Sequence, residues 1–232
     1  MVNFFPHRLH AKRSIDMSPV VILGLGRFGM ALAEELVLYG VEVMAVDTEE
    51  RRVNAASRTL AHCVVADSVD IEVLRKLGVD EVQRAVVAIG SNLEASILSA
   101  SNLVELGVPN IWAKADSDAH ARILEQIGAH HVVRPERDTA RRVAHLLDGS
   151  FQDYAEFDEH HGVIKMVPPR SVSRHHNPND FLYNEYGVYV TSCRIPGKGW
   201  LPAAKCDISA ADLALFAGDP AKLEAFAKAA GN

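Results

Sequence analysis

The chain has 232 residues, 48% of them hydrophobic, which is enough for one large folded domain or for a large and a small one. Its formal net charge is −6 with histidine neutral, so nucleic acid is not expected as the main partner, because that class of protein needs a basic face against the phosphates. No run of 18 or more apolar residues occurs, so we expect no membrane span.

The segment 1–18 and the cysteines bear on where the protein works. The segment is interrupted by proline and basic residues and lacks the apolar stretch of a signal peptide, so we expect a flexible or weakly helical arm, with a start at Met17 as an alternative. Cys63, Cys193 and Cys206 lie far apart and form no C-x-x-C motif. We therefore expect no disulfide framework and a reducing, cytoplasmic environment.

From residue 19 to 149 one unit recurs, in which a short β-branched stretch is followed by a helical pattern. The strand-like stretches are apolar enough to be buried on both faces, as parallel strands are. Several helical patterns end at glycine, where a left-handed residue costs least. The repetition predicts an α/β domain with a Rossmann-type, doubly wound parallel sheet. The predicted strands are residues 20–24, 41–47, 62–67, 84–90, 110–115 and 130–135.

The pattern changes after residue 149. Residues 150–232 contain many turn residues and strand-like stretches at 162–168, 187–196 and 212–219, and a final helix is expected from Pro220. These features predict a small, mostly antiparallel α+β domain.

The stretch VVILGLGRFGMALAEEL carries Gly24, Gly26 and Gly29 at the G-x-G-x-x-G spacing, between the first predicted strand and helix. In such a turn Gly24 permits the tight bend, Gly26 lets the backbone approach a phosphate, and Gly29 lets the helix pack close to the strand. The helix N-terminus adds free N–H groups and partial positive charge. The motif in this context predicts a site for a nucleotide or dinucleotide phosphate.

Asp47 ends the second predicted strand, about 20 residues beyond the motif, where a carboxylate can hold a ribose diol. A carboxylate there disfavours the 2′-phosphate of NADP, although Arg52 is a nearby cation that points the other way. The alternative for Asp47 is a cap for the helix that follows Thr48.

Two further loops are expected to open onto the same crevice, because they follow the carboxyl ends of neighbouring strands. They are Asp67–Ser68, and the run of Ala88, Ile89 and Gly90. Ser68 has an alternative role as the N-cap of the next helix. Arg27, inside the glycine turn, suits phosphate oxygens with its planar fork; the alternative is an exposed loop arginine.

No arrangement of catalytic residues accompanies the motif. A dehydrogenase needs a proton donor or acceptor beside its nicotinamide, and the C-terminal part offers no convincing one. The adjacent histidine pairs favour surface positions over a zinc site, because neighbours in a strand point to opposite faces. Two functions stay open, namely a ligand-sensing regulator without catalysis and an NAD(H)-binding oxidoreductase or redox-sensing protein.

The chain resembles an RCK domain, a regulator of potassium conductance, in four stretches: VVILGLGRFGMALAEEL, VEVMAVDTEERRVN, AVVAIGSNLEASIL and VPNIWAKADSDAHARILEQIGAHHVVRPE. Its nearest resemblance is to the soluble subunits of Ktr- and Trk-type potassium uptake systems, over residues 19–148. The resemblance implies an RCK N-lobe at 19–149 and a C-lobe at 150–232. The C-lobe stretch NPNDFLYNEYGVYV lacks the arginine expected of a cyclic di-AMP site, so that ligand is not expected.

The resemblance also implies an assembly. The helix Pro135–Leu147 would cross onto a second subunit, and dimers would combine into an octameric ring. The ring would dock on a Ktr/Trk-type membrane subunit at the inner face of the cell membrane. Exchange of ATP against ADP would change the ring's shape and gate the pore, without catalysis; NAD or NADH is the alternative ligand.

Carried over by position, the resemblance gives a set of nucleotide-binding groups. The glycine turn would bind the phosphates, Asp47 at the end of the second strand would bind the ribose, and the loop Asp67–Ser68 would border the adenine. Glu125 would lie near the terminal phosphates, where it can bind Mg²⁺ or Ca²⁺. The implied residues are Gly24, Gly26, Arg27, Phe28, Gly29, Asp47, Thr48, Arg52, Asp67, Ser68, Ala88, Ile89, Gly90, Lys114 and Glu125.

Overall fold

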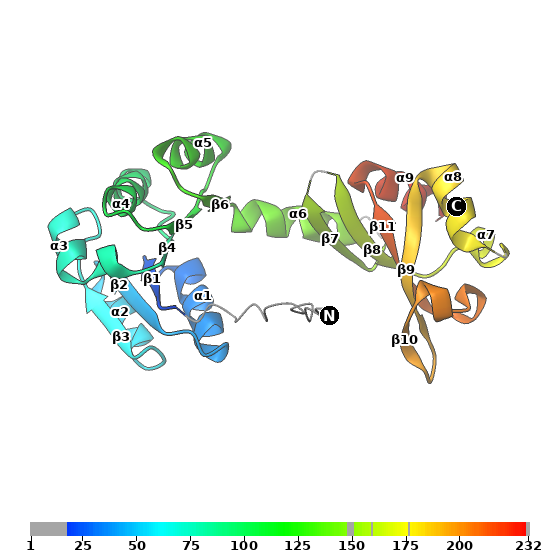
Figure 1. The fold of residues 1–232 in the computed structure, drawn as a ribbon, viewed down its shortest axis with the longest axis horizontal. Helices are drawn as coiled ribbons and strands as arrows, with labels where there is room; N and C mark the ends of the chain where they lie inside the picture. Colours follow the sequence, from blue (N-terminus) through cyan, green and yellow to red (C-terminus); the bar gives the residue numbers. More distant parts are fainter. Residues whose placement is uncertain (1–17, 148–150, 159, 176, 231–232) are drawn as a thin grey trace, which may run out of the picture. The chain divides into compact units, whose positions relative to one another are not determined.

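The computed structural model describes residues 18–147, 151–158, 160–175 and 177–230. The chain divides into two compact units, with the division between Pro135 and Glu136 (Figure 1). Among the described residues, no helix combines the length and the apolar character needed to cross a membrane.

The first unit contains a six-stranded sheet in the order β3-β2-β1-β4-β5-β6. Every neighbouring pair is parallel, so the predicted Rossmann-type sheet is confirmed. Gly40, Gly78, Gly107 and Gly128, which follow helical patterns in the sequence, all have positive φ. The strands are β1 (Val20–Leu23), β2 (Val43–Asp47), β3 (His62–Val65), β4 (Arg84–Val87), β5 (Asn110–Lys114) and β6 (His131–Val133).

Helices cover both faces of this sheet, as Figure 1 shows. Successive residues of β1 alternate between two cores: Val21 and Leu23 pack with α3, α4 and α5, whereas Val20 and Ile22 pack with α1 and α2. Because both faces are covered, the strand is apolar throughout. The helices are α1 (Arg27–Leu38), α2 (Glu50–Ala56), α3 (Ile71–Lys76), α4 (Leu93–Glu105) and α5 (Asp118–Ile127), and a short 3-10 helix η1 (Val79–Glu81) precedes β4.

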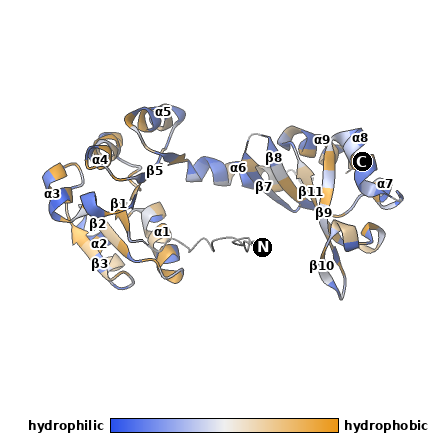
Figure 2. Ribbon diagram, in the orientation of Figure 1, coloured by the Kyte–Doolittle hydropathy of each residue, from blue (hydrophilic) through white to orange (hydrophobic). Residues whose placement is uncertain are grey.

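The second unit contains an antiparallel five-stranded sheet in the order β10-β9-β11-β8-β7. The three predicted strands and the final helix are confirmed, and β7 and β10 are additional. Figure 2 shows hydrophobic colouring along β9, as along β1 in the first unit. The strands are β7 (Asp153–Asp158), β8 (His161–Met166), β9 (Val188–Ile195), β10 (Gly199–Pro202) and β11 (Leu213–Gly218). The helices are α6 (Pro135–Leu147), α7 (Arg170–Ser173), α8 (Pro178–Tyr186), η2 (Ala203–Lys205), η3 (Ile208–Ala210) and α9 (Pro220–Ala230).

Ion pairs join α6 to the edge strand β7. Arg141 lies 3.0 Å from a Glu156 oxygen, and Arg142 lies 2.7 Å from an Asp153 oxygen. The hydrogen bond from Arg142 is the main reason why the pKa of Asp153 is lowered. Most of α6 is therefore part of the second unit.

The cysteines correct one expectation from the sequence. Cys193 of β9 and Cys206, just after η2, form a disulfide, with their Cα atoms 6.2 Å apart. The sequence gives no sign of the pairing, because only the return of the chain from β10 to the sheet brings these residues together. Cys63, in the first unit, is a free cysteine, and its burial raises the pKa of its thiol.

Candidate functional site

The glycine turn between β1 and α1 has a strict geometry at two of its three glycines. Gly24 has φ +103°, a conformation that other residues rarely adopt. A Cβ on Gly29 would lie 2.0 Å from the carbonyl oxygen of Gly24. Gly26 differs, because its φ is −68° and a Cβ there would meet nothing within 4 Å. The folded chain therefore requires glycine at positions 24 and 29 but not at 26.

The N-terminus of α1 is the electropositive part of the site. Gly26 is its N-cap, no side chain of the described residues caps the helix, and its first turn contains no acidic residue. The terminal N–H groups and the helix dipole are therefore available to an anion. Arg27 is exposed at the first helical position, and the half-buried Phe28 packs against the core of α1 and α2.

Asp47 is fixed at the end of β2, where its side chain is 5% exposed. One carboxylate oxygen accepts a hydrogen bond of 2.6 Å from the N–H of Leu25, and the other accepts one of 2.8 Å from the N–H of Glu49. The structure makes Glu49 the N-cap of α2, so Asp47 supports the start of that helix from outside it. The neighbouring Thr48 is exposed.

Arg52 places a positive charge beside this carboxylate. Its Nη1 lies 3.4 Å from Asp47 Oδ2, and its Nε lies 2.8 Å from Glu49 Oε2. The Arg52 side chain is 43% exposed, so water screens the pair and its contribution to stability is small.

The loop after β4 packs directly against the glycine turn. The N–H of Ala88 donates to the carbonyl of Leu23 at 2.7 Å, and a Cβ on Gly24 would lie 3.0 Å from Ile89 Cγ1. A Cβ on Gly90 would lie 2.8 Å from Lys114 Nζ. The predicted residues of β1, β4 and β5 are thus neighbours at the carboxyl edge of the sheet.

Sequence reasoning missed Asp116, which neighbours Lys114, and His120, which contacts Asp116. Asp116 lies 3.2 Å from the Lys114 ammonium group, and the N–H of Asp116 donates to His120 Nδ1 at 3.3 Å. His120 is 2% exposed, and burial lowers its pKa, with the charge of Asp116 acting in the opposite direction. The position of Asp116, two residues beyond a predicted site lysine at a strand end, is the signal that could have found it.

The loop after β3 is held by α4. The Ser68 hydroxyl lies 2.7 Å from that of Ser99, and Asn102 Nδ2 donates to the Ser68 carbonyl at 3.0 Å. The cap of α3 is Asp70, which accepts from the N–H groups of Glu72 and Val73. The alternative of Ser68 as N-cap is therefore wrong, since α3 begins too late for it. Asp67 is exposed, and its carboxylate accepts from the N–H of Val69.

Glu125 lies apart from these groups within one chain. It is exposed in the last turn of α5, a helix that begins at the carboxyl edge and runs back along the sheet. The part of the chain that the structure describes contains no group of three or more His, Cys, Asp or Glu residues suited to a metal ion. Of the histidine pairs, His131 stacks on Trp112, and His130 Nδ1 accepts from the N–H of Ile111.

Residues 20–135 match the TrkA-N domain, which spans the sheet and glycine turn described above. The chain belongs to the TrkA-N domain family. It is 38% identical to the Ktr system potassium uptake protein C of Bacillus subtilis over 174 residues, 75% of this chain and 79% of the relative. It is 33% identical to the Ktr system potassium uptake protein A of the same organism over 188 residues, 81% of this chain and 85% of the relative.

Solved structures confirm that this TrkA-N family member has the RCK fold. The GsuK RCK domain superposes with a TM-score of 0.63 at 13% identity, over all of this chain and 51% of that one. The GsuK channel bound to NAD gives a TM-score of 0.62 at 14% identity, over 89% of this chain and 38% of that one. GsuK bound to ADP gives a TM-score of 0.50 at 24% identity, over 57% of this chain and 34% of that one.

Proposed function

We propose that the chain is a cytoplasmic, nucleotide-sensing regulatory subunit that gates a potassium-translocating membrane protein of the Ktr type. It binds ATP or ADP at the carboxyl edge of the first unit and performs no catalysis. The homology to two Ktr system proteins over most of their length supports the system, and the glycine turn supports the ligand class.

The observation that carries the ligand proposal is Gly26. Gly24 and Gly29 are needed for the turn itself, but a side chain at position 26 would contact nothing in the folded chain. A glycine that the fold does not need, at the uncapped N-terminus of α1, fits the close approach of a phosphate group.

The other predicted groups surround this point. Arg27 extends beside the phosphates, Asp47 receives the ribose, and Arg52 balances its charge. Ala88, Ile89 and Gly90 form the wall next to the turn, with Lys114 beyond them. Asp67, Ser68, Phe28 and Thr48 are assigned to the border of the site, where the structure leaves Asp67 and Thr48 exposed.

Glu125 completes the site only through a second copy. Within one chain α5 carries it away from the glycine turn, so we propose that it serves Mg²⁺ or Ca²⁺ at the phosphates of a facing subunit. The exposed Val143 and Leu147 of α6 supply an apolar contact for self-association into dimers and an octameric ring. A shape change of the ring requires a difference in ligand affinity between its two states.

The proposal is tested by isothermal titration of the full chain with ATP, ADP, NADH and NADPH. We expect ATP and ADP to bind, and Gly26→Ala to abolish both while its cost in stability stays near the ~1 kcal/mol of an alanine at a helix N-cap. Binding of the nicotinamides alone would overturn the proposal, and so would undiminished ATP and ADP binding to Gly26→Ala.

The second candidate is an NAD(H)-binding oxidoreductase or redox-sensing protein, which would use the same turn and Asp47. It is favoured by one specific observation, namely that the related fold of the GsuK channel has been solved bound to NAD. A hydride-transfer assay across alcohols, hydroxy acids and aldehydes tests the oxidoreductase, because a regulator gives no turnover. The titration with ATP, ADP and NADH tests the redox-sensing protein, which would bind the nicotinamide and not the adenine nucleotides.

A further inference from the structure

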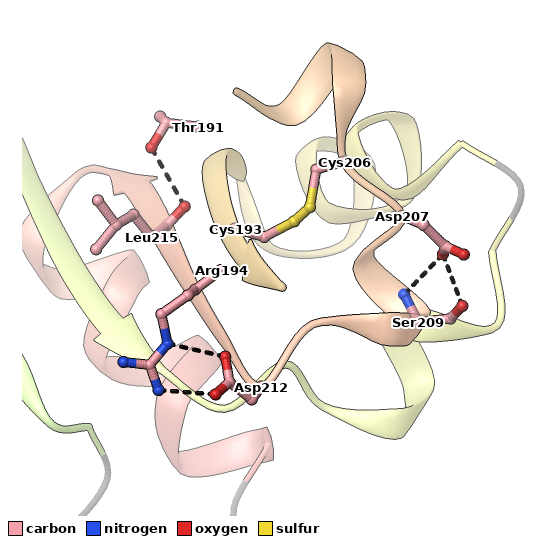
Figure 3. The surroundings of a disulfide bond; sticks show 8 residues. All are labelled: Thr191, Cys193, Arg194, Cys206, Asp207, Ser209, Asp212 and Leu215. Atoms are coloured by element: carbon pink, nitrogen blue, oxygen red, sulfur yellow. Dashed lines mark hydrogen bonds and ion pairs between the residues drawn. A yellow bond between two sulfur atoms is a disulfide. The ribbon is translucent and has the colours of Figure 1, made fainter. Parts of the chain in front are cut away.

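The disulfide of the second unit joins β9 to a point within the excursion that the chain makes between β9 and β11. Cys193 is fully buried on β9, opposite Leu201 of β10 and Ala214 of β11. Cys206 is half-buried and follows η2. Figure 3 shows the two sulfurs joined, with Asp207 and Ser209 of the following segment nearby.

The excursion, residues 194–212, contains the edge strand β10 and the short helices η2 and η3. Within the described sheet β10 pairs with β9 alone. An ion pair joins the two ends of the excursion, because Arg194 Nε and Nη2 donate to the two Asp212 oxygens at 3.0 and 2.7 Å (Figure 3). The side chains of this pair are 43% and 41% exposed, so water weakens it.

We propose that Cys193 and Cys206 form a reversible thiol-oxidation site, which opens and closes by exchange with low-molecular-weight disulfides such as oxidised glutathione. The separation of their Cα atoms lies within the range that a disulfide spans without backbone movement. The site is separate from the proposed nucleotide crevice and does not depend on it.

The exchange proceeds in two balanced steps. The thiolate of the more accessible Cys206 attacks one sulfur of glutathione disulfide, forms a mixed disulfide and releases one glutathione thiolate. The Cys193 thiol then gives up its proton and attacks the Cys206 sulfur, which releases the second glutathione. Two protein thiols are oxidised to one disulfide, and one glutathione disulfide is reduced to two thiols.

The oxidation state sets how firmly the excursion is held. In the oxidised chain a covalent bond joins the end of η2 to β9 and limits the fluctuations of β10 and η2. In the reduced chain the β9–β10 pairing, the exposed Arg194–Asp212 ion pair and the hydrogen bond from the Asp212 N–H to the Arg194 carbonyl remain. We expect faster amide hydrogen exchange in residues 196–205 after reduction, while β8 and β11 are unchanged.

The experiment uses the full chain with Cys63→Ser, which removes the free thiol of the first unit and leaves the pair as the only thiols. Thiols are counted by alkylation and mass spectrometry after equilibration in glutathione buffers of graded ratio. We expect both thiols to disappear together as the buffer becomes oxidising and to return together with dithiothreitol. Cys193→Ser and Cys206→Ser, each in this background, should instead leave one thiol or a single glutathione adduct.

Trypsin provides an independent readout, because Lys198 and Lys205 both lie between the two cysteines. A nick at either lysine in the oxidised chain should leave the fragments joined on a non-reducing gel and separate on a reducing gel. Two thiols that stay free in oxidised glutathione, or a disulfide that dithiothreitol cannot open in the folded chain, would overturn the proposal. A stable glutathione adduct on Cys206 in the presence of Cys193 would overturn it as well.

Discussion

The buried carboxylate of Asp47 accepts a hydrogen bond of 2.6 Å from the backbone N–H of Leu25. The end of β2 and the middle of the glycine turn are thereby fixed to each other in the free chain. A ligand that contacts both parts meets them already in position, which lowers the cost of ordering the site.

The first prediction concerns Asp47→Asn. The amide keeps the size of the side chain but loses the negative charge, so its hydrogen bonds to Leu25 N–H and to a ribose diol both weaken. We expect ATP and ADP affinity to fall about tenfold, on the order of 1.4 kcal/mol. Titration calorimetry measures this, with the exposed Glu50→Gln as the matched control; equal affinities for the Asp47 variant and the unchanged chain would exclude the ribose role.

Gly29→Ala should damage the fold as well as the site. The new methyl group would overlap the carbonyl oxygen of Gly24, so α1 must shift away from β1. We expect a loss of about 3 kcal/mol in the free energy of unfolding. Urea denaturation measures it, and Gly26→Ala is the control, since its methyl group meets nothing within 4 Å. Equal stability of the two variants would contradict the geometry of the turn.

Arg27→Ala should weaken ATP more than ADP. A guanidinium at the first residue of α1 contributes most to the ligand with the longer and more highly charged phosphate chain. We expect a loss of about tenfold for ATP and less for ADP. Arg51→Ala, whose side chain is 88% exposed on α2, is the matched control. An equal loss for both nucleotides would show that Arg27 contacts only the phosphates they share.

Glu125→Gln tests the proposed cation role. If the carboxylate binds a divalent ion at the phosphates, its neutral amide should remove the gain in ATP affinity that Mg²⁺ or Ca²⁺ provides. Titrations with and without the cation measure that gain directly. The neighbouring Gln126→Ala, also exposed on α5, serves as control. A cation effect that survives in Glu125→Gln would rule the role out.

The last prediction concerns pH. Burial lowers the pKa of His120 below the 6.5 of the exposed side chain, so under mildly acidic conditions the unfolded chain binds a proton that the folded chain does not. The contribution of neutral His120 to the free energy of unfolding is therefore fully present above pH 6.5 and falls as the pH drops below that value. We expect His120→Gln to reduce this slope, by at most about 1.4 kcal/mol per pH unit. Urea denaturation between pH 5 and 8 measures it; the exposed His62→Gln should keep the slope, and a slope unchanged in His120→Gln would contradict the assignment.

The sequence predicts the strands whose residues are apolar on both faces, because burial requires it. β1, β2, β4 and β11 belong to this class, and the other predicted strands are indicated by short β-branched or alternating apolar stretches. The edge strands β7 and β10 are not predicted, since apolar and charged residues alternate in β7 and β10 is only four residues long, beginning with a glycine and ending with a proline. An edge strand needs little hydrophobicity, so its pattern resembles a loop.

For the candidate site, motif spacing predicts the glycine turn and Asp47 but not the contacts between loops. The pairing of Lys114 with Asp116 and the hydrogen bond between Ser68 and Ser99 depend on how separate strands and helices meet. The disulfide has the same origin. None of these follows from local pattern, because each joins residues that only the tertiary fold brings together.

The buried cores of the two units share no residue. Each unit has a buried interior of its own, so we expect each to open and close as a cooperative block. The covalent path between the two sheets runs through Pro135 and α6, and the ion pairs of Arg141 and Arg142 attach that helix to β7. A change at the end of β6 that moved α6 would therefore act directly on the edge of the second sheet.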